Sequence, residues 1–442
     1  MKRRKGFDAD TANRSPFRAI LGNTAMLLGG RGVTAVLSLV YVGLAARSLG
    51  VEGFGLLTLV HAFAQTVGDF AEFNSWQATL HYGIQPLRDR RIGDLYRVLR
   101  FSLLLDAIGA VGGTAVALLA ILFFSGPLGM PADLTAVAML YATSILFMSS
   151  TTPLGVLRLM DRFDLVAIQT TVSSVIRLIG ALVVFFTGGG LGAWLFVWYV
   201  STLAAFLFMV GAAILVMRRH AKDEAIPFLR DLRPFTRDMP GAWRFVWNIN
   251  LSSSLGLVTG RVALLAVGFG LGAREAAFFR IAKQVADAAT RPAKLLVPAL
   301  YPELARLWME RDIPRLGRLC LQIAATAGAV ATGALAILFL FGDDLITLVV
   351  GPEFLGATEV MLWLFGSAVV TVWALPLEPL LISTGRSGKA LQARAIVAVA
   401  YLATLFPLMN GMGLAGAGIA GLAAAILQFM LQLAFVLRSN RR

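Results

Sequence analysis

Five charged residues recur at helical spacing within an otherwise apolar stretch that extends from about Ala276 to Leu304. They are Arg280, Lys283, Asp287, Arg291 and Lys294. At about 100° per residue, these positions fall on one narrow arc of an α-helix. Cations outnumber anions on this arc, and guanidinium groups contact phosphate oxygens bidentately. The chemistry that this arc predicts is binding of an anion, with an anionic head group as the simplest ligand.

A second polar arc lies about half a chain length earlier and matches the first position by position. It comprises Thr58, His61, Gln65, Asp69 and Glu72. Imidazole and carboxyl groups can bind and release protons, so this arc could serve ion coupling or form a gate with the later arc. The candidates for that role are His61, Asp69, Glu72 and Asp287. The alternative interpretation is polar contact between packed helices.

The composition indicates that membrane-spanning helices carry these residues. Hydrophobic residues make up 58% of the 442 positions and charged residues only 14%, and the mean hydropathy is +0.76. These values exclude an ordinary soluble domain. A charged residue at the centre of a bilayer costs about 2.5–3.5 kcal/mol. We therefore expect both polar arcs to face a water-filled cavity or partner groups.

Hydropathy predicts an all-α polytopic protein with twelve transmembrane helices, because each apolar segment is long enough to cross a hydrocarbon core of about 30 Å. The predicted spans are 19–46, 54–82, 101–124, 134–157, 164–187, 193–217, 245–272, 276–304, 317–341, 358–382, 391–410 and 414–437.

The distribution of Lys and Arg predicts the orientation. Thirty of the 39 Lys and Arg residues lie in the two tails and in the loops after even-numbered spans, if Arg318 and Arg394 at the loop-facing ends of the following spans are included, whereas only Arg47 and Arg274 lie in loops on the other side. By the positive-inside rule, both termini and the loops after even-numbered spans are expected in the cytoplasm. The net charge of +14 is therefore a topology signal, and no nucleic acid is expected as a partner.

The constant offset between the two arcs predicts that the chain contains two copies of one half. Asp69 precedes Arg291 by the same number of positions as Glu72 precedes Lys294, and that number is close to half the chain. A repeat with an even number of spans gives two parallel lobes, with the binding site between them. The expected domains are a cytoplasmic tail (1–18), an N-lobe (19–217), a cytoplasmic linker (218–244), a C-lobe (245–437) and a second tail (438–442).

Three further cations lie inside predicted spans. Arg31 is placed about 18 Å deep in the first span at about 1.5 Å per residue, so it is a candidate ligand of the anion. Pairing with Asp69 or Glu72 is the alternative. Arg177 and Arg261 are weaker candidates for the same cavity.

Several segments in chain order resemble one family. These are LAARSLGVEGFGLL (44–57), FGLGAREAAFFRIAKQV (269–285), GPEF (351–354), STGRSGKALQAR (383–394) and GMGLAGAGIA (411–420). They are similar to segments of polysaccharide-exporting flippases in the multidrug/oligosaccharidyl-lipid/polysaccharide (MOP) superfamily. One departure is Gly260 before Arg261, where many relatives carry an Asp.

The resemblance implies a protein that is not an enzyme and that flips undecaprenyl-pyrophosphate-linked oligosaccharide from the inner to the outer leaflet. Such flippases serve O-antigen or exopolysaccharide synthesis, and a polysaccharide polymerase or chain-length regulator is a candidate partner. It implies that Arg31, Arg280, Lys283, Arg291 and Lys294 line a cationic central cavity.

Two other functions stay open. A cation-coupled multidrug antiporter could share the fold, but it is expected to carry an acid in the first span, where this chain carries Arg31. A membrane-embedded polymerase or glycosyltransferase usually has a large extracytoplasmic loop, and the longest one expected here, about 341–357, lacks Lys, Arg and His. Three histidines and one cysteine predict no metal site, no Walker A motif is present, and no cofactor is expected.

Overall fold

The computed structural model describes residues 16–124, 134–220, 239, 241–294 and 297–438, and every regular element in these ranges is a helix. The first half contains α1 (Pro16–Ala71), α2 (Ser75–Arg88), α3 (Ile92–Phe124), α4 (Thr135–Ala142), α5 (Ile145–Met148), α6 (Thr151–Leu159), α7 (Phe163–Thr187) and α8 (Leu191–His220). The second half contains α9 (Ala242–Leu271), α10 (Ala273–Lys294), α11 (Val297–Met309), α12 (Ile313–Val349), the 3-10 helix η3 (Pro352–Phe354), α13 (Ala357–Trp373), α14 (Leu377–Ser383) and α15 (Ser387–Leu437).

The helices have the apolar outer surface of a membrane protein. Eight segments of the described residues are long and apolar enough to cross a membrane, and two of these are 52 and 50 residues long. Large apolar side chains point outward, with Phe186 80% exposed and Phe339 73% exposed. In water such a surface would drive association, whereas a bilayer solvates it. The all-α polytopic prediction is confirmed, and the count of twelve spans stays a prediction.

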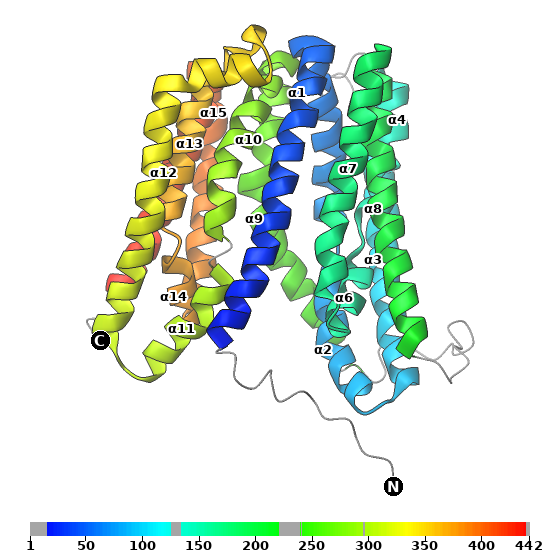
Figure 1. Ribbon diagram of the computed structural model, residues 1–442, viewed down its shortest axis with the longest axis vertical. Coiled ribbons are helices and arrows are strands. Elements are labelled where there is room, and N and C mark those ends of the chain that lie inside the picture. The colour runs from blue at the N-terminus through cyan, green and yellow to red at the C-terminus, as the bar shows by residue number, and fades with distance from the viewer. Residues whose placement is uncertain (1–15, 125–133, 221–238, 240, 295–296, 439–442) are drawn as a thin grey trace.

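The two halves form two lobes, which we call the N-lobe (α1–α8) and the C-lobe (α9–α15). The lobes approach each other at the end that contains the fold-back of α1, the tip end, and their other helices diverge toward the opposite end, the tail end (Figure 1). Helix α1 begins at the tail end, and α10 lies in the middle of the molecule between the lobes (Figure 1).

The backbone repeats between the lobes at the offset that the sequence predicts. Gly50 (φ 66°) interrupts α1 where the chain folds back, and Gly272 (φ 101°), at the matching position of the second half, separates α9 from α10. Glycine adopts this left-handed region without the steric cost of a Cβ atom. Arg90 (φ 55°) and Arg311 (φ 57°) occupy matching turns at nearly the same offset. The parallel two-lobe architecture is thus built from two similar backbone paths.

Helix α9 crosses between the lobes, and its first residues pack on the N-lobe. At the start of α9, Trp243 contacts Phe101 with ring centroids 5.4 Å apart, and Phe245 stacks on His81 at 4.6 Å. Both partners belong to the N-lobe. The domain limits themselves stay a prediction.

Candidate substrate-binding site

The polar arc of α10 lies on a helix that the two lobes share. Its opposite faces pack mainly on α13 of the C-lobe and on α1 of the N-lobe. The apolar positions Ala277, Phe279 and Ala282 are buried, whereas the charged positions are less buried. The arrangement keeps the charges of the arc away from the packed core.

Within the arc, Lys283 Nζ lies 3.6 Å from Asp287 Oδ1, with the side chains 31% and 42% exposed. Such a partly exposed pair one helical turn apart contributes only about 0.3–0.5 kcal/mol. Arg291 is exposed and forms no ion pair within the described residues. Asp69 and Arg291 are therefore not paired in this conformation, and the gate expected between the two arcs stays a prediction. An exposed guanidinium of this kind can accept an incoming anion without first giving up a partner.

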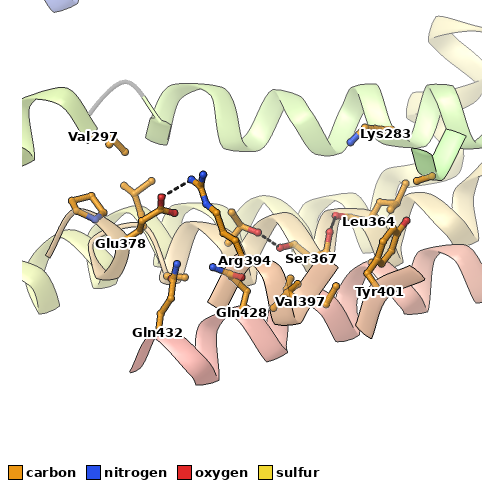
Figure 2. A pocket seen from close by; sticks show the side chains of 18 of the residues that line it. Lys283, Val297, Leu364, Ser367, Glu378, Arg394, Val397, Tyr401, Gln428 and Gln432 are labelled. Carbon is orange, nitrogen blue, oxygen red and sulfur yellow. Dashed lines mark hydrogen bonds and ion pairs between the residues drawn. The ribbon is translucent and has the colours of Figure 1, made fainter. Parts of the chain in front are cut away.

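A cavity of about 770 Å³ lies inside the C-lobe and has Lys283 on its wall. Helices α9, α10, α11, α13, α14 and α15 supply its lining, and no N-lobe residue contributes among those that the structure describes. Lys283 and Tyr401 lie toward one end of the cavity, and Glu378 and Gln432 lie toward the other (Figure 2). The volume is within the range of about 300–1,000 Å³ that ligand pockets occupy.

Glu378 and Arg394 form an ion pair at this cavity, with Arg394 Nη2 donating to Glu378 Oε1 at 2.5 Å (Figure 2). Glu378 follows the break between α13 and α14. Pro376 and Pro379 favour such a break in the sequence, but the sequence does not predict the pair, because Arg394 is counted there as a loop charge that sets the orientation. The spacing of Gln428 and Gln432, one helical turn apart in an apolar segment, is the sequence signal that could have revealed the cavity.

The N-lobe arc faces the interior of its own lobe. His61 is buried at 3% exposure, and its Nδ1 lies 2.6 Å from the hydroxyl of Tyr141 on α4. Its ring also packs edge-on against Trp198 of α8, with centroids 4.5 Å apart. These contacts stabilise the packing of α1 against α4 and α8. They agree with the alternative interpretation of the arc, polar contact between packed helices. A role for His61 in ion coupling stays a prediction.

Gln65 and Asp69 line a second cavity, of about 390 Å³, inside the N-lobe. The rest of its wall includes polar side chains of α7 and α8, among them Gln169, Ser173 and Thr202. Glu72 lies in the short interval between α1 and α2, and its backbone N–H donates to Gly68 O at 2.8 Å. The structure thus brings Gln65 and Asp69 together with polar groups of the N-lobe.

The side chain of Arg177 lies inside the N-lobe. Its Nε donates to Ser201 Oγ at 2.8 Å, and its guanidinium carbon lies 5.4 Å from the Trp198 ring centroid and 5.9 Å from that of Tyr41. These are hydrogen-bond and cation–π contacts of a kind that position helices. The side chains of the remaining sequence candidates, Arg31, Arg261 and Lys294, lie outside the described residues.

The lobes contact each other closely at the tip end. A Cβ atom on Gly55 of α1 would lie 2.0 Å from the carbonyl oxygen of Ala273 at the start of α10. Arg47 Nη2 donates to the carbonyl oxygen of Leu348 in α12. Phe354 of η3 packs against Phe54, with ring centroids 6.1 Å apart. Together these contacts close the space between the lobes at this end.

Comparison with known proteins identifies the family. The model of a family described as "Polysaccharide biosynthesis protein" matches residues 20–308, which is more than half of the chain. The chain belongs to the polysaccharide biosynthesis protein family. Its similarity to the inner membrane protein YghQ of Escherichia coli (strain K12) is 34% identity over 349 residues, covering 78% of this chain and 96% of that protein.

Solved structures show the same fold. An inward-facing multidrug resistance MATE family transporter of the MOP superfamily superposes with a TM-score of 0.72 at 16% identity, covering 92% of this chain and 95% of that one. The lipid II flippase MurJ in an inward closed conformation superposes with a TM-score of 0.70 at 11% identity, covering 93% and 87%. The family member thus has the fold of MOP flippases and transporters, as the sequence motifs predict.

Proposed function

We propose that this protein flips undecaprenyl-pyrophosphate-linked oligosaccharide from the inner to the outer leaflet of the bacterial inner membrane, for O-antigen or exopolysaccharide synthesis. The observation that carries the proposal is the charged arc of α10 on a helix shared by both lobes. Arg280, Lys283 and Arg291 offer cations, and Asp287 is the anion within the described part of the arc. A pyrophosphate group is a suitable ligand because bidentate contacts to guanidinium are strong.

The transport step is alternating access of the two lobes. With the tip end closed by contacts such as Gly55 to Ala273, substrate enters from the tail end. By the charge bias of the loops the tail end is the cytoplasmic side, where the lipid-linked oligosaccharide is made. A ligand shifts such an equilibrium only by binding one state more tightly. Pyrophosphate held between the lobes supplies that difference.

The protein spans the lipid bilayer several times, so it contacts both leaflets. The distribution of Lys and Arg predicts that both termini lie in the cytoplasm. A polysaccharide polymerase or chain-length regulator would receive the flipped unit. The transport chemistry forms and breaks no covalent bond, so no catalytic residue is assigned.

The rival function is a multidrug antiporter of the same fold. Its cationic substrates would meet a surface of the same sign on α10, where like charges repel. The neutral polar wall of the C-lobe cavity is also less suited to a hydrophobic cation than an acidic wall. Charge therefore favours an anionic substrate.

Loss of surface polysaccharide tests the proposal. In cells that depend on the protein for export, Arg280→Ala and Arg291→Ala, made separately, should each reduce export about ten- to a hundred-fold, because one charge-assisted contact is lost. Arg315→Ala is the matched control, since Arg315 is 72% exposed outside the arc and near the tail end. Wild-type export in both arc variants, at normal membrane levels, contradicts the proposal.

A further inference from the structure

The wall of the C-lobe cavity presents uncharged hydrogen-bonding groups that have no protein partner among the described residues. Gln432 is 3% exposed and Tyr401 is 4% exposed, yet neither side chain forms a hydrogen bond with any residue that the structure describes. Gln428, which is partly buried, lines the same cavity and also forms no side-chain hydrogen bond with a described residue. Buried polar groups are normally paired, so the two buried groups, Gln432 and Tyr401, indicate a ligand or solvent in the cavity that completes their hydrogen bonds.

Gln428 and Gln432 lie one turn apart in the part of α15 after its break at Gly413, Tyr401 lies in the part before it, and all three line one cavity (Figure 2). Each amide offers two N–H donors and an acceptor oxygen, and the tyrosine hydroxyl can do either. The hydroxyls of Ser367 and Thr371, which also line the cavity, donate to backbone carbonyls at 2.7 and 2.8 Å and keep their acceptor lone pairs available. The wall can therefore both donate to and accept from a ligand at several points.

The charges of the cavity are largely compensated. Glu378 pairs with Arg394 toward one end of the cavity, and Lys283 pairs with Asp287 toward the other (Figure 2). Because the charged side chains of the cavity are already paired with each other, the cavity favours a neutral ligand over another phosphate group. A sugar meets these requirements, because its hydroxyl groups are neutral donors and acceptors and the cavity has a volume of about 770 Å³.

We propose that this C-lobe cavity is a carbohydrate subsite, in which Gln428, Gln432 and Tyr401 bind the sugars of the lipid-linked oligosaccharide while the arc of α10 holds its pyrophosphate. The inference rests on the proposed function and adds a second contact region to it. Lys283 joins the two regions, because it belongs to the arc and lines the cavity. The subsite would make affinity depend on the sugar as well as on the lipid pyrophosphate.

Binding to the purified full-length protein in detergent tests the subsite. The probes are bare undecaprenyl pyrophosphate and the lipid-linked oligosaccharide extracted from cells of the source strain that lack the protein. The variants are wild type, Gln428→Leu combined with Gln432→Leu, and Gln322→Leu as the matched control on the exposed face of α12. Thermal unfolding checks that all three are folded.

Wild type and the control should bind the sugar-bearing lipid at least about ten-fold more tightly than the bare lipid, because two or more hydrogen bonds are added. The double variant should bind both lipids about equally, with unchanged affinity for the bare lipid. A sugar-dependent gain that persists in the double variant, or that is absent from wild type, overturns the subsite. If neither lipid binds to wild type, the proposed function fails, and the subsite fails with it.

Discussion

Gly55 and Ala273 come from different lobes and touch so closely that a methyl group on Gly55 would lie 2.0 Å from the Ala273 carbonyl oxygen. Atoms of a well-packed interface do not approach to that distance, so the absence of a side chain at Gly55 permits this closure. A side chain at position 55 would therefore force the two backbones apart at the tip end. The contact therefore gives a direct way to perturb the balance between the two access states.

Gly55→Ala should shift the protein toward a state in which the lobes separate at the tip end and approach each other at the tail end. The added methyl group destabilises only the closed tip, and a shift of about 1.4 kcal/mol changes the ratio of the states ten-fold. The measurement is the distance between spin labels on Asp89→Cys and Glu310→Cys, exposed positions near the tail end, with Cys320 replaced by Ala. We expect a shorter distance than in the parent protein.

Gly112→Ala is the control for this measurement, because a Cβ atom there meets nothing within 4 Å. It should leave the distance distribution unchanged. The same distribution in the Gly55→Ala protein as in the parent would contradict the role of this contact in closure.

Variants of Asp69 and Arg291 would test whether the two matched arcs form a gate between the lobes. Asp69 lines the N-lobe cavity, and Arg291 is exposed and without an ion pair among the described residues, so the two are not bridged here. We predict that they meet when the tail end closes. Asp69→Arg alone should abolish export, and Asp69→Arg with Arg291→Asp should restore part of it, because the reversed pair again attracts.

The check on the gate is cross-linking. A protein with Asp69→Cys and Arg291→Cys, again without Cys320, should form a disulfide whose yield changes when lipid-linked oligosaccharide is added. An unchanged yield, together with no recovery in the charge-reversed pair at normal membrane levels, would count against the gate.

Asp106 is predicted to matter for stability and not for transport. Its carboxylate accepts hydrogen bonds from Ser75 Oγ at 2.6 Å, from Thr151 Oγ1 at 2.6 Å and from the N–H of Thr152 at 2.8 Å. It thereby joins α3 to α2 and to the start of α6. Asp106→Ala leaves buried donors without acceptors and should cost about 1–3 kcal/mol, seen as a lower apparent melting temperature in detergent.

Asp106→Asn should cost less than Asp106→Ala, because an amide oxygen can accept from Thr152 while the hydroxyls become acceptors. Asp89→Ala is the control, since that carboxylate is 45% exposed and paired only at the surface. Equal melting temperatures for Asp106→Ala and Asp89→Ala would show that the buried network contributes nothing to stability.

The sequence predicts the features that depend on local periodicity. The apolar segments, the repeat of one half of the chain in the other and the cationic arc of α10 follow from residue type and spacing. The fold-back at Gly50 and its counterpart at Gly272 follow the same repeat. These are properties of residue order along the chain, so a single sequence reveals them.

Contacts between distant segments are not predicted in this way. The Glu378–Arg394 pair joins two helices, and a loop-charge count assigns Arg394 to topology instead. The packing of His61 on Tyr141 and Trp198 depends on which face of α1 meets α4 and α8, which spacing alone does not specify. The close approach of Gly55 to Ala273 likewise requires the placement of the two lobes.

Translocation by the purified protein tests the central proposal most directly. Proteoliposomes would carry extracted lipid-linked oligosaccharide in the inner leaflet, and a glycosidase added outside would report its arrival in the outer leaflet. We predict cleavage at least about ten-fold faster than in protein-free vesicles, and a return toward the protein-free rate in Arg280→Ala and Arg291→Ala. Equal rates with and without the wild-type protein, in vesicles where its insertion is verified, would contradict the proposal that it flips this lipid.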